Sequence, residues 1–347
     1  MTLLYGDPAP AVVLEGVSNP RNVLDTAAGR YLLLAFAPAG PAVAAALETL
    51  ARRRAAFDDV HASAFVIVVG EDEARPSRQD ALPGLRFLFD ADCAAAALYA
   101  AGEAERWVLL DPALQVMAAV GPDQAAALGE RVPTLPPPAA LGGFAATAPV
   151  LVTPRIFEPA FCERLIALYR EVGGAPSGFM REVEGVTTLM MNDRHKRRSD
   201  VIVEDEGLQK QLVARLTRRL IPQIEKAFNF KPTRIERHLV ARYDADTGGF
   251  FRPHRDNTTK GTAHRRFAVS INLNADYDGG DLRFPEFGDR TYRPPPGGAC
   301  VFSCSILHEA TPVTRGERFA FLPFLYDEAA AKVREQNRQY LDPALTA

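Results

Sequence analysis

The chain has 347 residues, with 47% hydrophobic residues, 24% charged residues and a formal net charge of −3 at pH 7. These values are ordinary for a soluble globular protein, and the length allows two domains with separate cores. The small net charge gives no electrostatic reason to expect nucleic acid or an anionic membrane as a partner.

Cysteine content and the absence of targeting signals bear on the compartment. The four cysteines are few and irregularly spaced, which favours a reducing environment over a disulfide framework. The first residues lack a basic segment followed by an apolar one, and no run approaches about 18 apolar residues. We therefore expect a cytoplasmic protein without a membrane span.

The N-terminal third alternates apolar runs with alanine-rich segments. Residues 31–38 are continuously apolar, which predicts a strand buried on both faces of a sheet. The pattern predicts further strands at 64–69, 85–89 and 107–110, and helices at 41–57 and 94–101. Alternating strands and helices indicate an α/β domain.

This order of elements resembles the thioredoxin fold, and specifically its peroxiredoxin branch. The segments that carry the resemblance are Gly6–Pro10, Phe36–Pro38 and Arg106–Asp111. The family motif places Thr or Ser and then Cys after its proline, but here Ala42 and Ala45 follow Pro38, with Glu48 three residues later. Peroxide reduction needs a thiolate, so residues 1–134 are predicted to be redox-inactive and to serve docking or homodimerisation. An alternative is a thiol reductase acting through Cys93, which opens a predicted helix.

Residues 135–147 form a proline- and glycine-rich linker, and residues 148–347 form the second predicted domain. Apolar residues at helical spacing predict supporting helices at 159–172 and 206–228, the latter kinked by Pro222. Between these helices, residues 173–197 are predicted to form a mobile substrate lid containing Met180, Met190 and Met191. The basic run at its end, Arg194–Arg198, is predicted to be a solvated face.

From residue 235 onward, short strands alternate with Gly and Pro, which indicates an antiparallel sandwich or barrel. His254 and Asp256 lie two residues apart, so on a strand they share one face. His308 begins a later strand, and Arg318 lies ten residues further on. Two histidines and a carboxylate are the ligand set of non-haem Fe(II) oxygenases. Arg318 offers the bidentate fork that the distal carboxylate of a 2-oxo acid needs.

The stretch 149–326 resembles the 2-oxoglutarate/Fe(II) dioxygenase superfamily, most closely its prolyl 4-hydroxylase-like branch. The matching segments are Arg198-Ser199, Tyr243–Asp256, Leu273–Phe284, Pro296-Gly297 and His308–Arg318. The resemblance implies an α+β double-stranded β-helix, which is a jelly-roll or cupin-type barrel with supporting helices. It implies that iron binds to His254, Asp256 and His308, and that 2-oxoglutarate binds to Arg318 and Tyr243, with Asn272 near that pocket.

The implied reaction hydroxylates an unactivated C–H bond of a prolyl or other residue in a peptide or protein. It consumes 2-oxoglutarate and O2, releases succinate and CO2, and in some relatives uses ascorbate as a reductant. A free amino acid or another small molecule is an alternative substrate. An alternative of another class is a non-catalytic metal-binding scaffold or oxygen sensor.

The remaining residues of interest receive structural interpretations. His195, His238 and His264 are predicted to lie at the surface or at the substrate rim. Cys300 and Cys304 are predicted to pack in the core. Arg315 is a rival to Arg318, but it occupies a Thr-Arg-Gly turn, whereas Arg318 enters the following strand.

Overall fold

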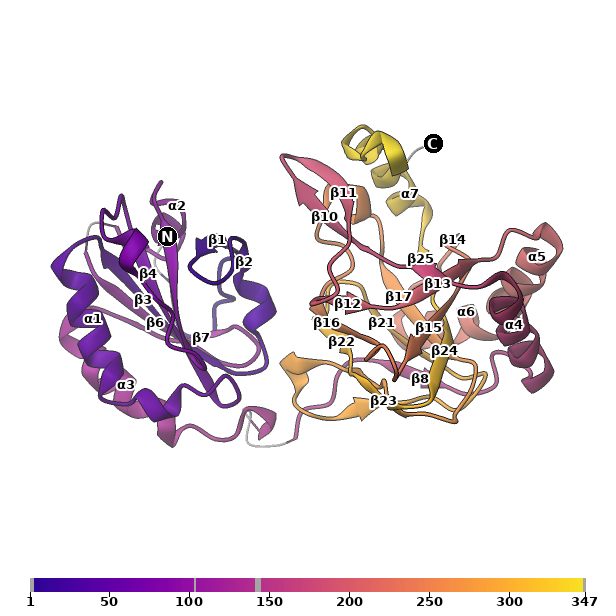
Figure 1. Ribbon diagram of the computed structural model, residues 1–347, viewed down its shortest axis with the longest axis horizontal. Helices are drawn as coiled ribbons and strands as arrows, with labels where there is room; N and C mark the ends of the chain where they lie inside the picture. Colours follow the sequence, from indigo (N-terminus) through magenta and orange to yellow (C-terminus); the bar gives the residue numbers. More distant parts are fainter. Residues whose placement is uncertain (1–2, 103, 141–144, 346–347) are drawn as a thin grey trace. The chain divides into compact units, whose positions relative to one another are not determined.

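The computed structural model describes residues 3–102, 104–140 and 145–345. The chain divides into two compact units (Figure 1). Unit 1 comprises Met1–Ala148 together with the short segment Phe284–Asp289, and unit 2 comprises Pro149–Arg283 and Arg290–Ala347.

Unit 1 is built on one seven-stranded sheet with the order β2-β1-β5-β4-β3-β6-β7. Strands β3, β4 and β5 are parallel, and the other neighbours are antiparallel. Helices α1 and α3 cover the same face of the sheet (Figure 1). The elements are β1 (Val13–Gly16), β2 (Asn22–Val23), β3 (Tyr31–Pro38), α1 (Pro41–Ala51), β4 (Ala62–Val69), β5 (Leu85–Asp90), α2 (Ala94–Leu98), β6 (Arg106–Leu110), β7 (Val116–Val120) and α3 (Ala125–Arg131).

The four strands and two helices expected in this region are present, with boundaries shifted by a few residues. The predicted helix 41–57 ends earlier, because α1 stops at Ala51 and a separate turn of 3-10 helix follows at Arg54–Ala56. Strands β1, β2 and β7 were not predicted. They lie toward the sheet edges, where partial exposure leaves a weaker apolar pattern.

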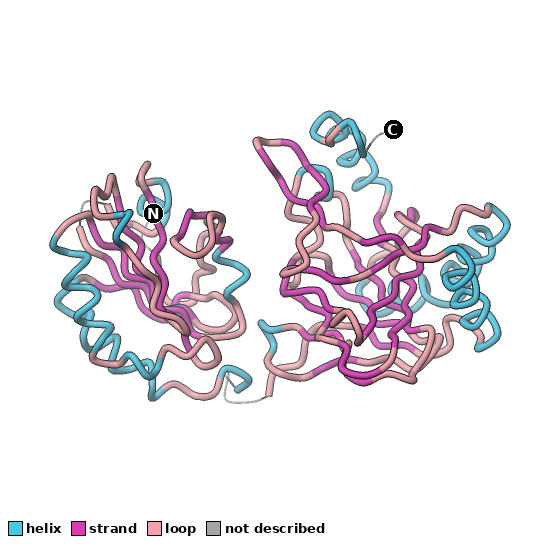
Figure 2. Tube along the Cα trace, viewed as in Figure 1, coloured by secondary structure: helices cyan, strands magenta, loops and turns pink. Residues whose placement is uncertain are grey.

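Unit 2 contains two larger antiparallel sheets whose inner faces share an apolar cluster, the arrangement of a jelly roll (Figure 2). The five-stranded sheet has the order β12-β16-β22-β19-β20, and the nine-stranded sheet follows β14-β25-β17-β24-β15-β13-β9, with β21 and β8 attached to β17. The strands of these sheets are β8 (Leu151–Thr153), β9 (Ala175–Pro176), β12 (Lys196–Arg197), β13 (Ser199–Ile202), β14 (Arg234–Glu236), β15 (Leu239–Asp244), β16 (Phe250–His254), β17 (Phe267–Asn272), β19 (Leu282–Arg283), β20 (Thr291–Tyr292), β21 (Ala299–Ser303), β22 (His308–Ala310), β24 (Glu317–Phe321) and β25 (Phe324–Tyr326).

Three helices pack on the outer face of the large sheet: α4 (Pro159–Val172), α5 (Glu206–Arg215) and α6 (Ile221–Phe228). The predicted helix 206–228 is interrupted by a π-helical turn at Leu216–Leu220. Pro222 follows this turn directly and has no N–H to donate to the carbonyl four residues before it, which accounts for the irregularity.

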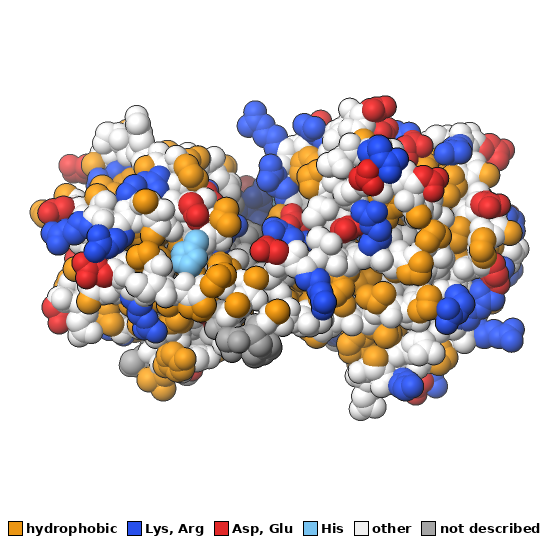
Figure 3. Space-filling view, turned by 90° about the horizontal axis from the view of Figure 1, so that it is seen from below, with side chains coloured by type: hydrophobic (Ala, Val, Ile, Leu, Met, Phe, Trp, Pro, Cys, Tyr) orange, Lys and Arg blue, Asp and Glu red, His pale blue; other side chains and the backbone are white. Residues whose placement is uncertain are grey.

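The predicted lid contains a β-hairpin, β10 (Phe179–Val183) and β11 (Val186–Met190), and the chain ends beyond helix α7 (Glu328–Gln336). On the face of the molecule shown in Figure 3, basic and acidic side chains are interspersed with hydrophobic ones. Among the described residues, no helix is both long and apolar enough to cross a membrane.

Candidate metal centre

The two histidines predicted as metal ligands face each other across a strand pair. His254 is the last residue of β16 and His308 the first of β22, and their Cα atoms are register partners. The sequence suggested that Asp256 lies on the same strand as His254. Asp256 instead lies just beyond the end of β16, so its carboxylate comes from a bend. A hydrogen bond of 2.9 Å from the Asp256 amide to the Cys304 carbonyl anchors this bend.

The three side chains bring their ligand atoms together. Asp256 Oδ1 lies 3.6 Å from His254 Nε2, and Asp256 Oδ2 lies 3.3 Å from His308 Nε2. One ligand atom from each residue lies within 4.8 Å of the other two. Two imidazoles and one carboxylate that leave further positions open suit an Fe(II) ion of the oxygenase type.

Backbone carbonyls set the tautomers of both histidines. His254 Nδ1 donates to the Arg252 carbonyl at 2.8 Å, and His308 Nδ1 donates to the Ile306 carbonyl at 3.0 Å. Since a carbonyl only accepts, each Nδ1 carries the proton and each Nε2 keeps its lone pair for a metal ion. The donor set therefore fits the predicted metal.

The protonation states agree with this assignment. Burial, followed by the proximity of His308, lowers the pKa of His254 to about 4, so the imidazole is neutral at pH 7. Burial alone would raise the pKa of Asp256, but the proximity of His308 and His254 outweighs it and holds that pKa well below its usual value. A neutral imidazole and an ionised carboxylate are the forms that bind a metal ion.

Arg318 is buried, at 2% exposure, on β24. Its Nη2 donates to Ser270 Oγ at 2.7 Å, and both Nε and Nη2 donate to Asn272 Oδ1, at 3.2 and 3.1 Å. It forms no ion pair with any residue in the described part of the chain. A buried guanidinium without a carboxylate is costly, so this side chain is suited to receive an anionic ligand.

Tyr243 and Asn272 frame this guanidinium. Tyr243 is the register partner of Arg318, and its ring centroid lies 5.2 Å from the guanidinium carbon. Asn272 accepts from Arg318 and donates from Nδ2 to the Pro294 carbonyl at 2.9 Å. The rival residue, Arg315, is exposed and pairs with Asp278 at 2.6 Å.

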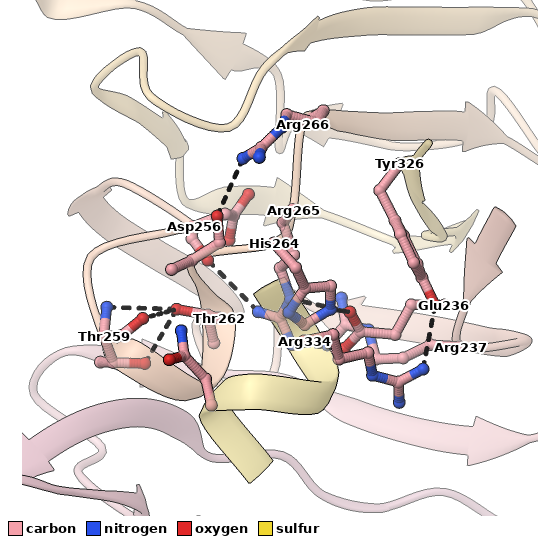
Figure 4. A network of polar contacts seen from close by, with 12 residues as sticks. Glu236, Arg237, Asp256, Thr259, Thr262, His264, Arg265, Arg266, Tyr326 and Arg334 are labelled. Atoms are coloured by element: carbon pink, nitrogen blue, oxygen red, sulfur yellow. Dashed lines mark hydrogen bonds and ion pairs between the residues drawn. The ribbon is translucent and has the colours of Figure 1, made fainter. Parts of the chain in front are cut away.

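Two interpretations of basic and histidine side chains were wrong. Within the basic run, Lys196 is 5% exposed and the Arg198 side chain is also 5% exposed, so both belong to the interior and not to a solvated face. His264 is buried at 2% exposure and pairs with Glu236, which also binds Arg265 (Figure 4). Lys196 is interior because β12 pairs with β16, where it is the register partner of the interior residue Phe251, and no local sequence pattern signals this pairing.

The other candidates are placed as follows. His195 packs against Phe179 and Phe251, and His238 is half-buried. Cys300 and Cys304 are buried, as predicted, whereas Cys93 is exposed at the start of α2.

Comparison with known proteins matches residues 238–326, about a quarter of the chain, to the model of the 2OG-Fe(II) oxygenase superfamily. This segment contains all six predicted site residues and confirms the resemblance of the C-terminal part. The superfamily's name contains the metal ion and the co-substrate that were predicted from the sequence, Fe(II) and 2-oxoglutarate. The resemblance of unit 1 to peroxiredoxins stays a prediction.

Two curated relatives are PKHD-type hydroxylases. The chain is 27% identical to that of Synechococcus sp. (strain JA-2-3B'a(2-13)) over 139 residues, covering 38% of this chain and 58% of the relative. It is 34% identical to that of Cupriavidus metallidurans over 99 residues, covering 26% of this chain and 42% of the relative. The match thus spans 58% of the length of the first relative and 42% of the length of the second.

Solved structures similar to this chain include a prolyl-4-hydroxylase of Pseudomonas putida, with a TM-score of 0.39 and 19% identity, over 52% of this chain and 94% of that one. Another is a prolyl hydroxylase of Trichoplax adhaerens in complex with a hypoxia inducible factor peptide fragment. Its TM-score is 0.40 and its identity 18%, over 55% of this chain and 87% of that one.

Proposed function

We propose that the protein is an Fe(II)- and 2-oxoglutarate-dependent dioxygenase that hydroxylates an unactivated C–H bond. The observation that carries the proposal is the buried guanidinium of Arg318, which forms no ion pair within the described residues and lies in the same barrel as the His254–Asp256–His308 set. When bound there, Fe(II) would supply the activation of dioxygen that the side chains cannot provide.

Each residue has a defined role in this proposal. His254, Asp256 and His308 hold the metal ion, and the carbonyl partners of the two histidines keep Nε2 available for it. Arg318 binds the distal carboxylate of 2-oxoglutarate as a bidentate fork, and Tyr243 packs beneath that fork. Asn272 orients Arg318, since its own amide is occupied by Pro294 and Arg318.

The apolar cluster of the barrel interior supports the same reaction. It contains Tyr243 from the larger sheet and Phe251 and Ala310 from the smaller one, together with Tyr277 and Val313. Such an apolar lining would limit the access of water to a bound metal ion. A dry, preorganised site strengthens the electrostatic interactions of Arg318 and Asp256 with their ligands.

A prolyl or other residue of a peptide or protein is the substrate that we infer first, because residues 149–326 resemble the prolyl 4-hydroxylase-like branch. The matched curated relatives are likewise named as hydroxylases. A free amino acid or another small molecule is the alternative.

The test is succinate formation from 2-oxoglutarate with Fe(II) and O2, in the absence of added substrate and again with a peptide panel. Oxygen- and iron-dependent succinate would support an enzyme. Its absence from a protein that binds both iron and 2-oxoglutarate would favour the scaffold or oxygen sensor, and ascorbate is tested in the same assay.

For unit 1 we infer a thioredoxin-like module without redox activity. Parallel β3 and β4 followed by antiparallel β6 and β7, with α1 and α3 on one face, support the fold. Ala45, where the peroxiredoxin motif carries its cysteine, is an exposed residue of α1 and has no thiol. Docking or homodimerisation through this unit is tested by measuring the molar mass of the intact protein in solution.

A further inference from the structure

The interior of unit 2 contains more cations than carboxylates. Lys196, Arg198, Arg265 and Arg318 have buried side chains, and the Nε atom of Arg237 is also buried. The interior carboxylates are those of Asp200, Glu236 and Asp256. Buried charges are normally paired, so two positive charges in excess require a partner.

Each of the three carboxylates is already engaged. Asp200 pairs with Arg198 at 2.5 Å. Glu236 pairs with Arg265 and with His264, both at 2.6 Å (Figure 4). Asp256 belongs to the metal centre, where it lies between the two histidines. Within the described residues, none of them forms an ion pair with Lys196 or Arg237, although Asp200 Oδ1 is buried without a hydrogen-bond partner.

Three cations therefore remain: Arg318, Lys196 and Arg237 form no ion pair within the described ranges. The proposed function assigns the distal carboxylate of 2-oxoglutarate to Arg318. Bound Fe(II) and the 2-oxoglutarate dianion cancel each other's charge, so the excess of two positive charges persists in the loaded site. Arg198 lies close to both Lys196 and Arg237. These three residues are called the second cationic group below.

The second cationic group adjoins both the metal centre and the 2-oxoglutarate pocket. Lys196 Nζ lies 4.9 Å from the centroid of the Phe251 ring, which stacks on the His254 ring with 3.5 Å between centroids. Arg198 Nη1 donates to the Tyr243 hydroxyl at 3.5 Å. One aromatic ring thus separates this group from the metal ligand.

The present environment of the group leaves its charges poorly compensated. Burial, followed by the charge of Arg198, lowers the pKa of Lys196 well below its usual value. Burial and the charges of Arg265 and Arg198 lower the pKa of Arg237 to about 10. Lys196 donates to Ser177 Oγ at 2.7 Å and to the Gly178 carbonyl, but neither acceptor is charged. The buried Nε atoms of Arg198 and Arg237 have no hydrogen-bond partner within the described residues.

We propose that the substrate carries a carboxylate that binds to the second cationic group, formed by Lys196, Arg198 and Arg237. Such an anion supplies one of the two missing negative charges and accepts hydrogen bonds from donors that now lack partners. Because the group adjoins His254, the oxidised C–H bond lies close to that carboxylate in the substrate. This inference rests on the proposed function and defines the class of its substrate.

The test compares two ligands of the same shape that differ in charge. N-acetyl-L-proline and N-acetyl-L-prolinamide are titrated against the intact protein with Mn(II) and saturating 2-oxoglutarate, without oxygen, so that the Arg318 pocket is filled. We expect the acid to bind about tenfold more tightly than the amide or better, the scale of one charge-assisted hydrogen bond. Equal affinities within this pair and also within the peptide pair described below, or binding of none of the four compounds, would overturn the inference.

Variants locate the binding site. Lys196→Met and Arg237→Met should each reduce the preference for the acid severalfold while leaving the affinity for 2-oxoglutarate unchanged. Arg197→Gln is the matched control, because Arg197 follows Lys196 on β12 but is exposed. An undiminished preference in both variants would also count against this site. If the wild-type protein does not bind 2-oxoglutarate, that result would instead contradict the proposed function itself.

A second pair of ligands distinguishes the source of the carboxylate. N-acetyl-prolyl-glutamyl amide and N-acetyl-prolyl-glutaminyl amide differ only in a side-chain charge. A preference confined to the first pair indicates a free acid or a chain terminus, whereas a preference confined to this second pair indicates an acidic side chain in a peptide. Either preference supports the inference, and the absence of both overturns it.

Discussion

The interiors of the two units are built from different kinds of residue. In unit 1, the central strands β3 and β4 are almost entirely buried and apolar, and the ion pair between Arg86 and Asp59 involves side chains that are 24% and 22% exposed. In unit 2, the row of Asp200, Ala241 and Ala320 across the large sheet combines a carboxylate whose side chain is 13% exposed with two small buried residues.

The difference indicates where a ligand is needed. Burial of an unpaired charge lowers the stability of the folded protein, whereas close packing of Leu, Val and Phe raises it. The apolar interior of unit 1 stabilises its fold. At Ala45, where the peroxiredoxin motif has its cysteine, unit 1 has no charged side chain. Unit 2 keeps Arg318 and Lys196 unpaired within the described chain, so its interior is organised around anions that the protein binds.

The largest expected effect comes from removing the carboxylate of the metal centre. Asp256→Ala leaves two imidazoles on opposite strands without the anionic ligand between them, so iron binding and succinate formation should fall to background. Iron content and succinate release are the measurements. Asp278→Ala is the control, because that carboxylate is exposed and pairs with Arg315. Normal iron content and turnover in Asp256→Ala would refute the metal assignment.

The next largest effect concerns the unpaired guanidinium. Arg318→Ala should raise the 2-oxoglutarate concentration for half-maximal succinate formation about 30-fold or more, the equivalent of losing roughly 2 kcal/mol. Arg318→Lys should lie between this variant and the wild type, because an ammonium keeps the charge but not the fork. Arg315→Ala should behave as the wild type. A large effect in Arg315→Ala with none in Arg318→Ala would reverse the assignment.

Local sequence patterns were sufficient for part of this architecture. Helix α4 has the predicted boundaries, and strand β3 lies where the apolar run placed it. The six site residues stand in one short stretch of sequence with recognisable spacing, which is why they could be proposed before their geometry was known.

The second cationic group could not be predicted in this way. Its members lie in a basic run and in a turn, where exposure is the usual outcome. Arg237 adopts a left-handed backbone, with φ of 67°, and it lies in the turn between β14 and β15. Lys196 is interior because of the register of β12 with β16, a contact between segments about 50 residues apart that no local pattern encodes.

A smaller effect should separate stability from activity in unit 1. Leu33 is fully buried on β3, so Leu33→Ala should lower the free energy of unfolding of this unit by about 2–5 kcal/mol. Leu98→Ala is the control, because that side chain is 49% exposed and should cost less than about 0.5 kcal/mol. Denaturant unfolding measures the first effect, and the 2-oxoglutarate dependence should be unchanged in both variants. A shift of that dependence in Leu33→Ala would show that packing in unit 1 bears on the chemistry.

The smallest expected effect concerns His195, whose ring lies 4.5 Å from that of Phe179 and 5.5 Å from that of Phe251. Burial, and then the charges of Arg252, Arg181 and Lys196, lower its pKa from 6.5 to about 4. Between these values the unfolded chain binds a proton that the folded protein does not, so stability falls as the pH is lowered from about 6.5 toward 4. His195→Phe keeps an aromatic ring but removes the imidazole, so the variant takes up as much as one proton less on unfolding in this pH range. We therefore expect a smaller loss of the urea midpoint from pH 7 to pH 5 than in the wild type. Equal losses would show that neither burial nor the neighbouring cations lower the pKa of His195, and would weaken the contrast between the two interiors.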